Sequence, residues 1–157
     1  MDANGYVRDK RRMSQGHLAI QPMIVPFDAN NAVALMRSFN DETDRLIATW
    51  TTDGGQSWSE TTPLELPNPS APVAAVLLSS GALLMAFNDV PDRLNLAVSD
   101  DRGHTWTVVH TIEQGNGEVR YPAMAQLPDG DIVLSYSTGT KRGIKALVFN
   151  EKWALGL

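Results

Sequence analysis

The chain has no cysteine and no apolar run long enough to cross a membrane. No disulfide can contribute to its stability, and the sequence carries no record of the redox compartment in which it folds. The N-terminal stretch also has no apolar core of signal-peptide length, so we expect a soluble chain with no membrane partner and an undetermined localisation. At 157 residues, 43% of them hydrophobic, the chain can bury a core without disulfides or a metal.

Basic residues are also few: 13 Lys and Arg face 18 Asp and Glu, so the formal charge is −5 at pH 7. Nucleic-acid binding needs a concentration of lysine and arginine, so we expect no nucleic-acid partner. The one basic cluster lies near the N-terminus and is typical of a solvated arm: Arg8, Lys10, Arg11 and Arg12. No histidine pair has the spacing of a metal site, so we expect neither a metal nor a cofactor.

A period of about fifty residues runs through the chain, marked by Pro22, Pro72 and Pro122. Each proline lies in a strand-like segment that is followed by a turn and two further apolar segments. The sequence therefore predicts an all-β fold of three repeated antiparallel meanders. The expected strands are Ile20 to Phe27, Ala32 to Phe39 and Arg45 to Thr51, then Pro72 to Leu78, Ala82 to Phe87 and Leu94 to Ser99, and finally Tyr121 to Leu127, Ile132 to Ser137 and Gly143 to Asn150.

The first two repeats continue into one shared turn, [ST]-x-D-x-G-x-[ST]-W, which spans Thr51 to Trp58 and Ser99 to Trp106. In such a turn the Asp side chain accepts bonds from backbone amides, Gly takes the φ > 0 position, and the Trp buries its ring. A calcium loop would need more oxygen ligands than the turn offers. We therefore expect a structural role for these residues: Asp53, Gly55, Trp58, Asp101, Gly103 and Trp106.

The repeated turn is the Asp box of the sialidase (neuraminidase) superfamily, and residues 17 to 153 resemble the C-terminal half of bacterial sialidase-like proteins with BNR repeats. This resemblance implies a β-propeller of about three blades, which is half of a six-bladed ring. The expected blades are 17–68, 69–118 and 119–157, preceded by an arm at 1–16. The third blade lacks an Asp box and a fourth strand, which Tyr6 to Met13 of the arm could supply.

The resemblance also implies a site away from the Asp boxes. Sialidases bind the sugar carboxylate with three arginines, ionise a tyrosine nucleophile with a glutamate, and use an aspartate as acid and base. Arg37 and Arg93 match two of the arginines. Tyr121 matches the nucleophile, and Pro122 is expected to hold it in an extended conformation. Gln21 takes the position of the glutamate, and Asn88 is a further candidate binder.

Each of these residues also has a simpler interpretation. Arg37 could pair with a nearby carboxylate, Arg93 could form a local salt bridge, and Tyr121 could line a core or channel without reacting. Gln21 cannot accept the tyrosine proton, and the first arginine and the acid/base aspartate would lie on blades that this chain does not contain. Two functions follow: a sialidase-like glycoside hydrolase fragment acting on acidic sugars, or an inactive propeller that binds glycans or serves as a scaffold.

An open arc of three blades leaves two blade faces exposed, because propellers bury their edges by closing into a ring. The sequence therefore also predicts a homo-oligomer, in which two copies close a six-bladed ring with C2 symmetry.

Overall fold

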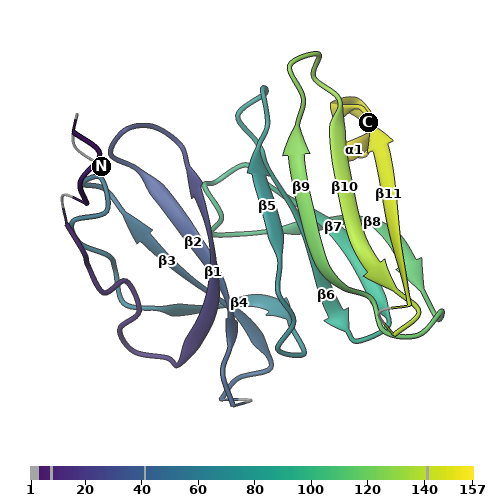
Figure 1. The fold of residues 1–157 in the computed structure, drawn as a ribbon, viewed down its shortest axis with the longest axis horizontal. Coiled ribbons are helices and arrows are strands. Elements are labelled where there is room, and N and C mark those ends of the chain that lie inside the picture. Colours follow the sequence, from purple (N-terminus) through teal and green to yellow (C-terminus); the bar gives the residue numbers. More distant parts are fainter. Residues whose placement is uncertain (1–3, 8, 41, 141) are drawn as a thin grey trace.

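A computed structural model of the chain describes residues 4–7, 9–40, 42–140 and 142–157. Within them, eleven strands form three antiparallel sheets that stand side by side in chain order (Figure 1). The predicted all-β arc of three blades is therefore confirmed. The described residues contain no helix long and apolar enough to span a bilayer.

Each blade is a meander whose strands pair in sequence order. Blade 1 comprises β1 (Ala19–Pro26), β2 (Ala32–Ser38), β3 (Arg45–Thr51) and β4 (Thr62–Pro67). Blade 2 comprises β5 (Ala74–Leu77), β6 (Leu83–Val90), β7 (Arg93–Ser99) and β8 (Thr107–Gln114). Blade 3 has only β9 (Arg120–Gln126), β10 (Ile132–Thr138) and β11 (Gly143–Phe149) among the described residues.

The three blades share one register, so positions can be compared between them. In each blade, one residue at the start of the second strand pairs with the end of the first strand and also with the end of the third strand. The pairs are Pro26 with Ala32 and Ala32 with Thr51, Leu77 with Leu83 and Leu83 with Ser99, and Gln126 with Ile132 and Ile132 with Phe149. Residues at the same distance from these pairs are called equivalent below.

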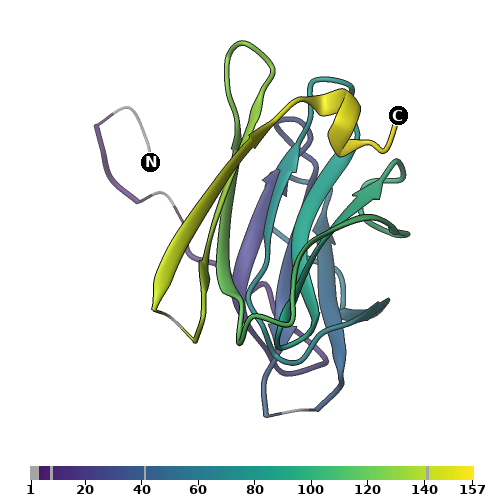
Figure 2. The ribbon, with the colours of Figure 1, turned by 90° about the vertical axis from the view of Figure 1, so that its right-hand side faces the viewer.

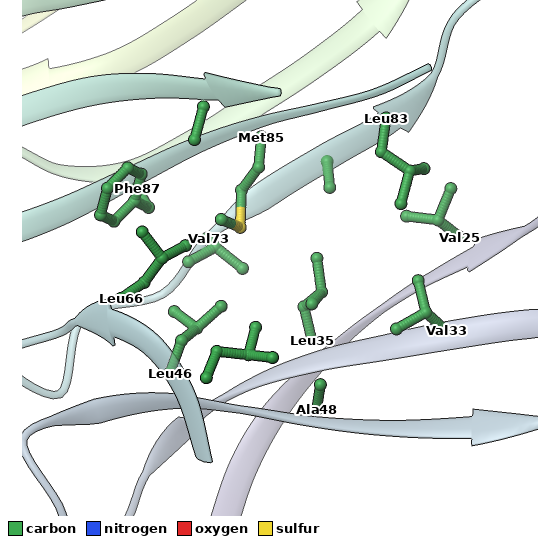
Figure 3. Close-up of a cluster of buried hydrophobic side chains, with 13 residues drawn as sticks. Val25, Val33, Leu35, Leu46, Ala48, Leu66, Val73, Leu83, Met85 and Phe87 are labelled. Atoms are coloured by element: carbon green, nitrogen blue, oxygen red, sulfur yellow. The ribbon is translucent and has the colours of Figure 1, made fainter. Parts of the chain in front are cut away.

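Two hydrophobic cores lie between the blades. The first joins the β2 and β3 side chains of blade 1 to β6 of blade 2, as Figure 3 shows for Leu35, Leu46, Met85 and Phe87. The second joins blade 2 to blade 3 and includes Leu94, Leu96, Ile132, Leu134 and Tyr136. Because each blade buries one face against its neighbour, the apolar alternation of the second and third strands is explained by packing between blades.

A short helix, α1 (Glu151–Ala154), follows β11 where an Asp box follows β3 and β7. The Asn150 side chain caps it by accepting a bond from the Trp153 amide. The Trp153 ring stacks on His110 of blade 2 with 3.9 Å between ring centroids. This helix, which the sequence analysis did not anticipate, therefore helps to join blades 2 and 3.

The N-terminal arm lies against blade 1 rather than in a sheet. The described residues of the Tyr6 to Met13 segment belong to no strand, and Arg8 of the basic cluster lies outside the described residues. Near the end of the arm, the Gln15 carbonyl accepts a bond from the Thr61 amide of blade 1 at 2.8 Å. The use of this segment as a fourth strand of blade 3 stays a prediction.

Candidate functional site

The two Asp boxes have the same hydrogen-bond geometry. In the first, an Asp53 carboxylate oxygen accepts a bond from the Ser57 amide at 2.9 Å, and the Thr51 hydroxyl oxygen accepts one from the Gly55 amide at 3.0 Å. In the second, Asp101 accepts the Thr105 amide at 2.8 Å. Bonds from the Ser57 side chain and backbone lower the pKa of Asp53 to about 2. The boxes thus close tight turns at one end of the blades, here called the box end.

The opposite end of the blades, where the innermost strands β1, β5 and β9 begin, is here called the site end. All five candidate site residues lie there: Gln21, Arg37, Asn88, Arg93 and Tyr121. A groove of about 380 Å³ is lined by residues 23–26, 75–77 and 124–126, in the half of the innermost strands nearer the box end, so none of the five candidate residues lines it. The candidate residues therefore share one end of the arc.

Gln21 and Tyr121 are equivalent residues of blades 1 and 3. Each precedes a proline within a β-bulge of its innermost strand, between Ile20 and Met23 in β1 and between Arg120 and Ala123 in β9. Each also has a positive φ, 54° at Gln21 and 56° at Tyr121. Both residues are exposed, so the bulge presents each side chain to solvent at the site end.

The expectation that Pro122 holds Tyr121 extended is wrong. A φ of 56° is left-handed, a conformation that costs a non-glycine residue energy. The physical reason is the bulge, which places one extra residue in β9 and rotates its backbone out of the strand conformation. The preference set by a following proline is weaker than this constraint of sheet pairing.

Arg37 lies near the end of β2 and is half-buried. Its Nη1 donates to the Ser70 carbonyl at 2.7 Å, in the loop that leads to blade 2. Its Nε is buried and has no hydrogen-bond partner among the residues that the structure describes. Buried donors are nearly always paired, so this Nε marks a place where a further acceptor would stabilise the site.

Asn88 is fully buried near the end of β6. Its Nδ2 donates to the carbonyls of Arg93 at 2.8 Å and Val119 at 2.9 Å, which joins the β6–β7 hairpin to the segment before β9. Its Oδ1 is buried and has no partner in the described ranges. The contacts of Asn88 are therefore with the protein backbone, and its role as a ligand contact stays a prediction.

Arg93, at the start of β7, forms an ion pair with Asp89. Its Nε donates to an Asp89 oxygen at 2.8 Å, and this bond raises the pKa of Arg93. Burial raises the pKa of Asp89, but the bond and charge of Arg93 outweigh it, so the net shift of that pKa is downward. The structure thus contains the local salt bridge that was one of the two interpretations of Arg93.

Two polar residues of the β4–β5 loop also belong to the site end, although sequence reasoning missed them. Ser70 has a φ of 51°, and its hydroxyl donates to the Ser38 carbonyl at 2.8 Å. Asn68 is 1% exposed and donates to the Asn88 carbonyl at 3.3 Å. A polar cluster just before Pro72 was the only sequence signal for this loop.

A second tyrosine is paired with a carboxylate between blades 2 and 3. The Tyr136 hydroxyl donates to Glu113 at 3.1 Å, and Lys145 also bonds to this carboxylate. Burial, together with Glu113, raises the pKa of Tyr136 to about 12. Tyr136 is 3% exposed, and its bond to Glu113 joins blade 3 to blade 2. No cluster of metal-ligating side chains occurs in the described ranges.

The fold and the repeated boxes define a sialidase-like propeller segment, and comparison with known proteins agrees. The model of the BNR repeat-like domain matches residues 1–134, so the chain belongs to this family. No curated protein matches the chain significantly.

Solved structures show the same fold. The NanB sialidase of Streptococcus pneumoniae superposes with a TM-score of 0.67 at 13% identity, over 85% of this chain and 23% of that protein. The intramolecular trans-sialidase of Ruminococcus gnavus gives 0.64 at 19% identity, over 87% and 33%. A protein of unknown function from Dyadobacter fermentans gives 0.64 at 15%, over 83% and 37%. The chain thus spans between about a quarter and two-fifths of these proteins.

Proposed function

We propose that the chain is a partial sialidase-like propeller that binds a carboxylate-bearing sugar at its site end. The observation that carries this proposal is Arg37, a half-buried guanidinium whose Nε has no hydrogen-bond partner within the described part of the chain. A guanidinium binds a carboxylate through two parallel bonds, which would use the Nε together with a second nitrogen. Sialidases among the similar structures make a sialic acid the first sugar to test.

The other candidate residues complete the proposed site. Gln21 and Tyr121 present their side chains from equivalent bulges, and Asn88 donates to the Val119 carbonyl in the segment that precedes Tyr121. Arg93 would contribute positive charge, although its guanidinium is partly neutralised by Asp89. In this proposal a ring closed by two copies would carry the set twice.

Calorimetric titration with N-acetylneuraminic acid tests the binding. Arg37→Ala should weaken affinity by roughly 10- to 100-fold, the value of a hydrogen bond to a charged group. Lys152→Ala is the matched control, because this cation lies in α1 at the box end. Equal affinities of the two variants would contradict the proposed site.

A separate question is whether the chain also hydrolyses the sugar that it binds. An assay with a fluorogenic sialoside tests this activity. Gln21 is an amide, so it cannot remove the proton of a tyrosine nucleophile. We therefore expect binding without measurable turnover by this chain alone. Turnover that is abolished by Tyr121→Phe would instead establish a sialidase-type hydrolase.

A further inference from the structure

Blade 3 exposes an apolar row on its third strand. Ile144 and Val148 of β11 are 76% and 63% exposed, and Ala146 between them is also exposed. These three residues alternate along the strand and therefore point to one side of the sheet. They are called the blade 3 face below, and Figure 2 views the molecule from the side of blade 3.

The equivalent residues of the other two blades are buried. Leu46 and Ala48 of blade 1 are 0% exposed and belong to the core shared with blade 2. Leu94 and Leu96 of blade 2 are likewise 0% exposed in the core shared with blade 3. The blade 3 face thus carries apolar side chains at the positions that, elsewhere in this chain, always contact the next blade.

Blade 1 carries the complementary face at the other end of the arc. In blade 2, Trp106 packs into the core shared with blade 1, and its equivalent in blade 1 is Trp58. Arm residues lie against this side of blade 1. A pocket of about 300 Å³ is lined by Asp9, Arg11 and Met13 of the arm together with Ile24 and Trp58. The side of blade 1 that bears Ile24 and Trp58 is called the Trp58 face.

We propose that the blade 3 face docks on the Trp58 face of a second copy of this chain, and that the N-terminal arm competes for the Trp58 face. The occupant is a second copy because both halves of a blade-to-blade contact are present on one chain. Two such contacts related by a twofold axis would close a ring. This inference specifies the ring closure proposed above, and its test needs no sugar.

The contact between blades 1 and 2 provides a template for the new contact. There the Trp50 ring of β3 stacks on His104 of the second Asp box, with 4.3 Å between ring centroids. The equivalent of Trp50 in blade 3 is Val148, and the equivalent of His104 in the first box is Gln56. Val148 of one copy should therefore lie beside Gln56 of the other.

Cross-linking through introduced cysteines tests this pairing, because the chain has no cysteine of its own. A short bismaleimide should link the double variant Val148→Cys, Gln56→Cys into covalent dimers. The variant Trp50→Cys, His104→Cys should form the equivalent link within one chain. The variant Gln114→Cys, Gln56→Cys is the matched control, because Gln114 is exposed at the end of β8 in blade 2, away from the proposed contact. Equal dimer yields for the control and the Val148 variant would overturn the proposal.

Light scattering without sugar tests the two faces separately. Val148→Asp should weaken self-association by roughly thirty-fold or more, as for a central interface residue, with an unchanged circular dichroism spectrum. Val108→Asp, at a 49% exposed position of β8, should leave association unchanged. Deletion of residues 1–13 should strengthen association, because it uncovers Trp58.

A wild-type chain that stays monomeric at its highest soluble concentration would overturn the proposal, as would weaker association after the deletion. Neither result would affect the sugar site, which calorimetry measures independently.

Discussion

Arg37 and Asn88 are equivalent residues of blades 1 and 2, and each bonds its own blade to the next. Arg37 donates to the carbonyl of Ser70 at 2.7 Å, and Asn88 donates to that of Val119 at 2.9 Å. Both carbonyls belong to segments that lead into the following blade. In blade 3 the equivalent residue is Ser137, whose shorter side chain donates to Arg120 of its own blade at 2.8 Å. This position therefore joins blades as well as forming part of the candidate site.

Removing the Asn88 amide should destabilise the contact between blades 2 and 3. Asn88→Ala leaves the Arg93 and Val119 carbonyls without this donor, so we expect the free energy of unfolding to fall by about 1–3 kcal/mol. Urea unfolding measures the change. Ser137→Ala, which removes a bond within one blade, should cost less. The interpretation fails if the two variants lose equal stability.

Glu113 should stabilise the same contact through its charge. Glu113→Gln keeps a polar group near Tyr136 but removes the ion pair with Lys145, so we expect a loss of about 1–3 kcal/mol at neutral pH. The bond from Lys145 lowers the pKa of Glu113, so this stabilisation is present above the ordinary carboxyl pKa and is lost as the pH falls. Unfolding curves at neutral and acidic pH should show a difference from wild type that shrinks with acid. A constant difference would argue against an ionic contribution.

The second Asp box should make stability depend on pH in a defined window. Burial raises the pKa of Asp101, but bonds from Thr105 and Ser99 lower it to about 2, from an ordinary value of 3.8. A depressed carboxyl pKa stabilises the fold above the unfolded pKa, and the effect is lost as the pH falls through the folded one. Asp101→Asn should therefore be less stable than wild type at neutral pH. Thermal unfolding should show this gap narrowing between about pH 4 and pH 2, and a gap that widens there would contradict the assignment.

The left-handed backbone at Tyr121 predicts an unusual order of stabilities. Glycine adopts a positive φ without the cost that alanine bears, so Tyr121→Gly should be more stable than Tyr121→Ala by about 1 kcal/mol. Gln21 offers a matched test, because its φ is also positive. Denaturant unfolding of the four variants decides the point. At either position, an alanine variant more stable than its glycine counterpart would show that the residue is not held left-handed.

The repeat could be predicted from sequence because its signals are local. The predicted strand Arg45 to Thr51 has the bounds of β3, and the other predicted strands differ from the structure by a few residues at their ends. Alternating apolar residues and Gly- or Asp-containing turns determine such strands without reference to distant parts of the chain. The helix after β11 was missed because its four residues carry no periodic pattern, and it is held by contacts with blade 2.

The candidate site was less predictable because its geometry arises between blades. The backbone of Tyr121 depends on an extra residue in β9, and the Asn88 bonds depend on where Val119 lies in space. Ser70 was missed because its contact with Arg37 joins residues 33 positions apart in the chain. Sequence identifies polar residues near strand ends, whereas register and blade packing decide which of them meet.

The most direct test of the sugar site is an NMR titration of the labelled chain with N-acetylneuraminic acid and, in parallel, with its methyl ester. The ester keeps the sugar but removes the charge that Arg37 is proposed to bind. We predict that the acid shifts the amide signals of Gln21, Arg37 and Tyr121 and that the ester leaves them unchanged. Equal shifts with both compounds, or shifts confined to the Asp boxes, would contradict a carboxylate site at this end of the blades.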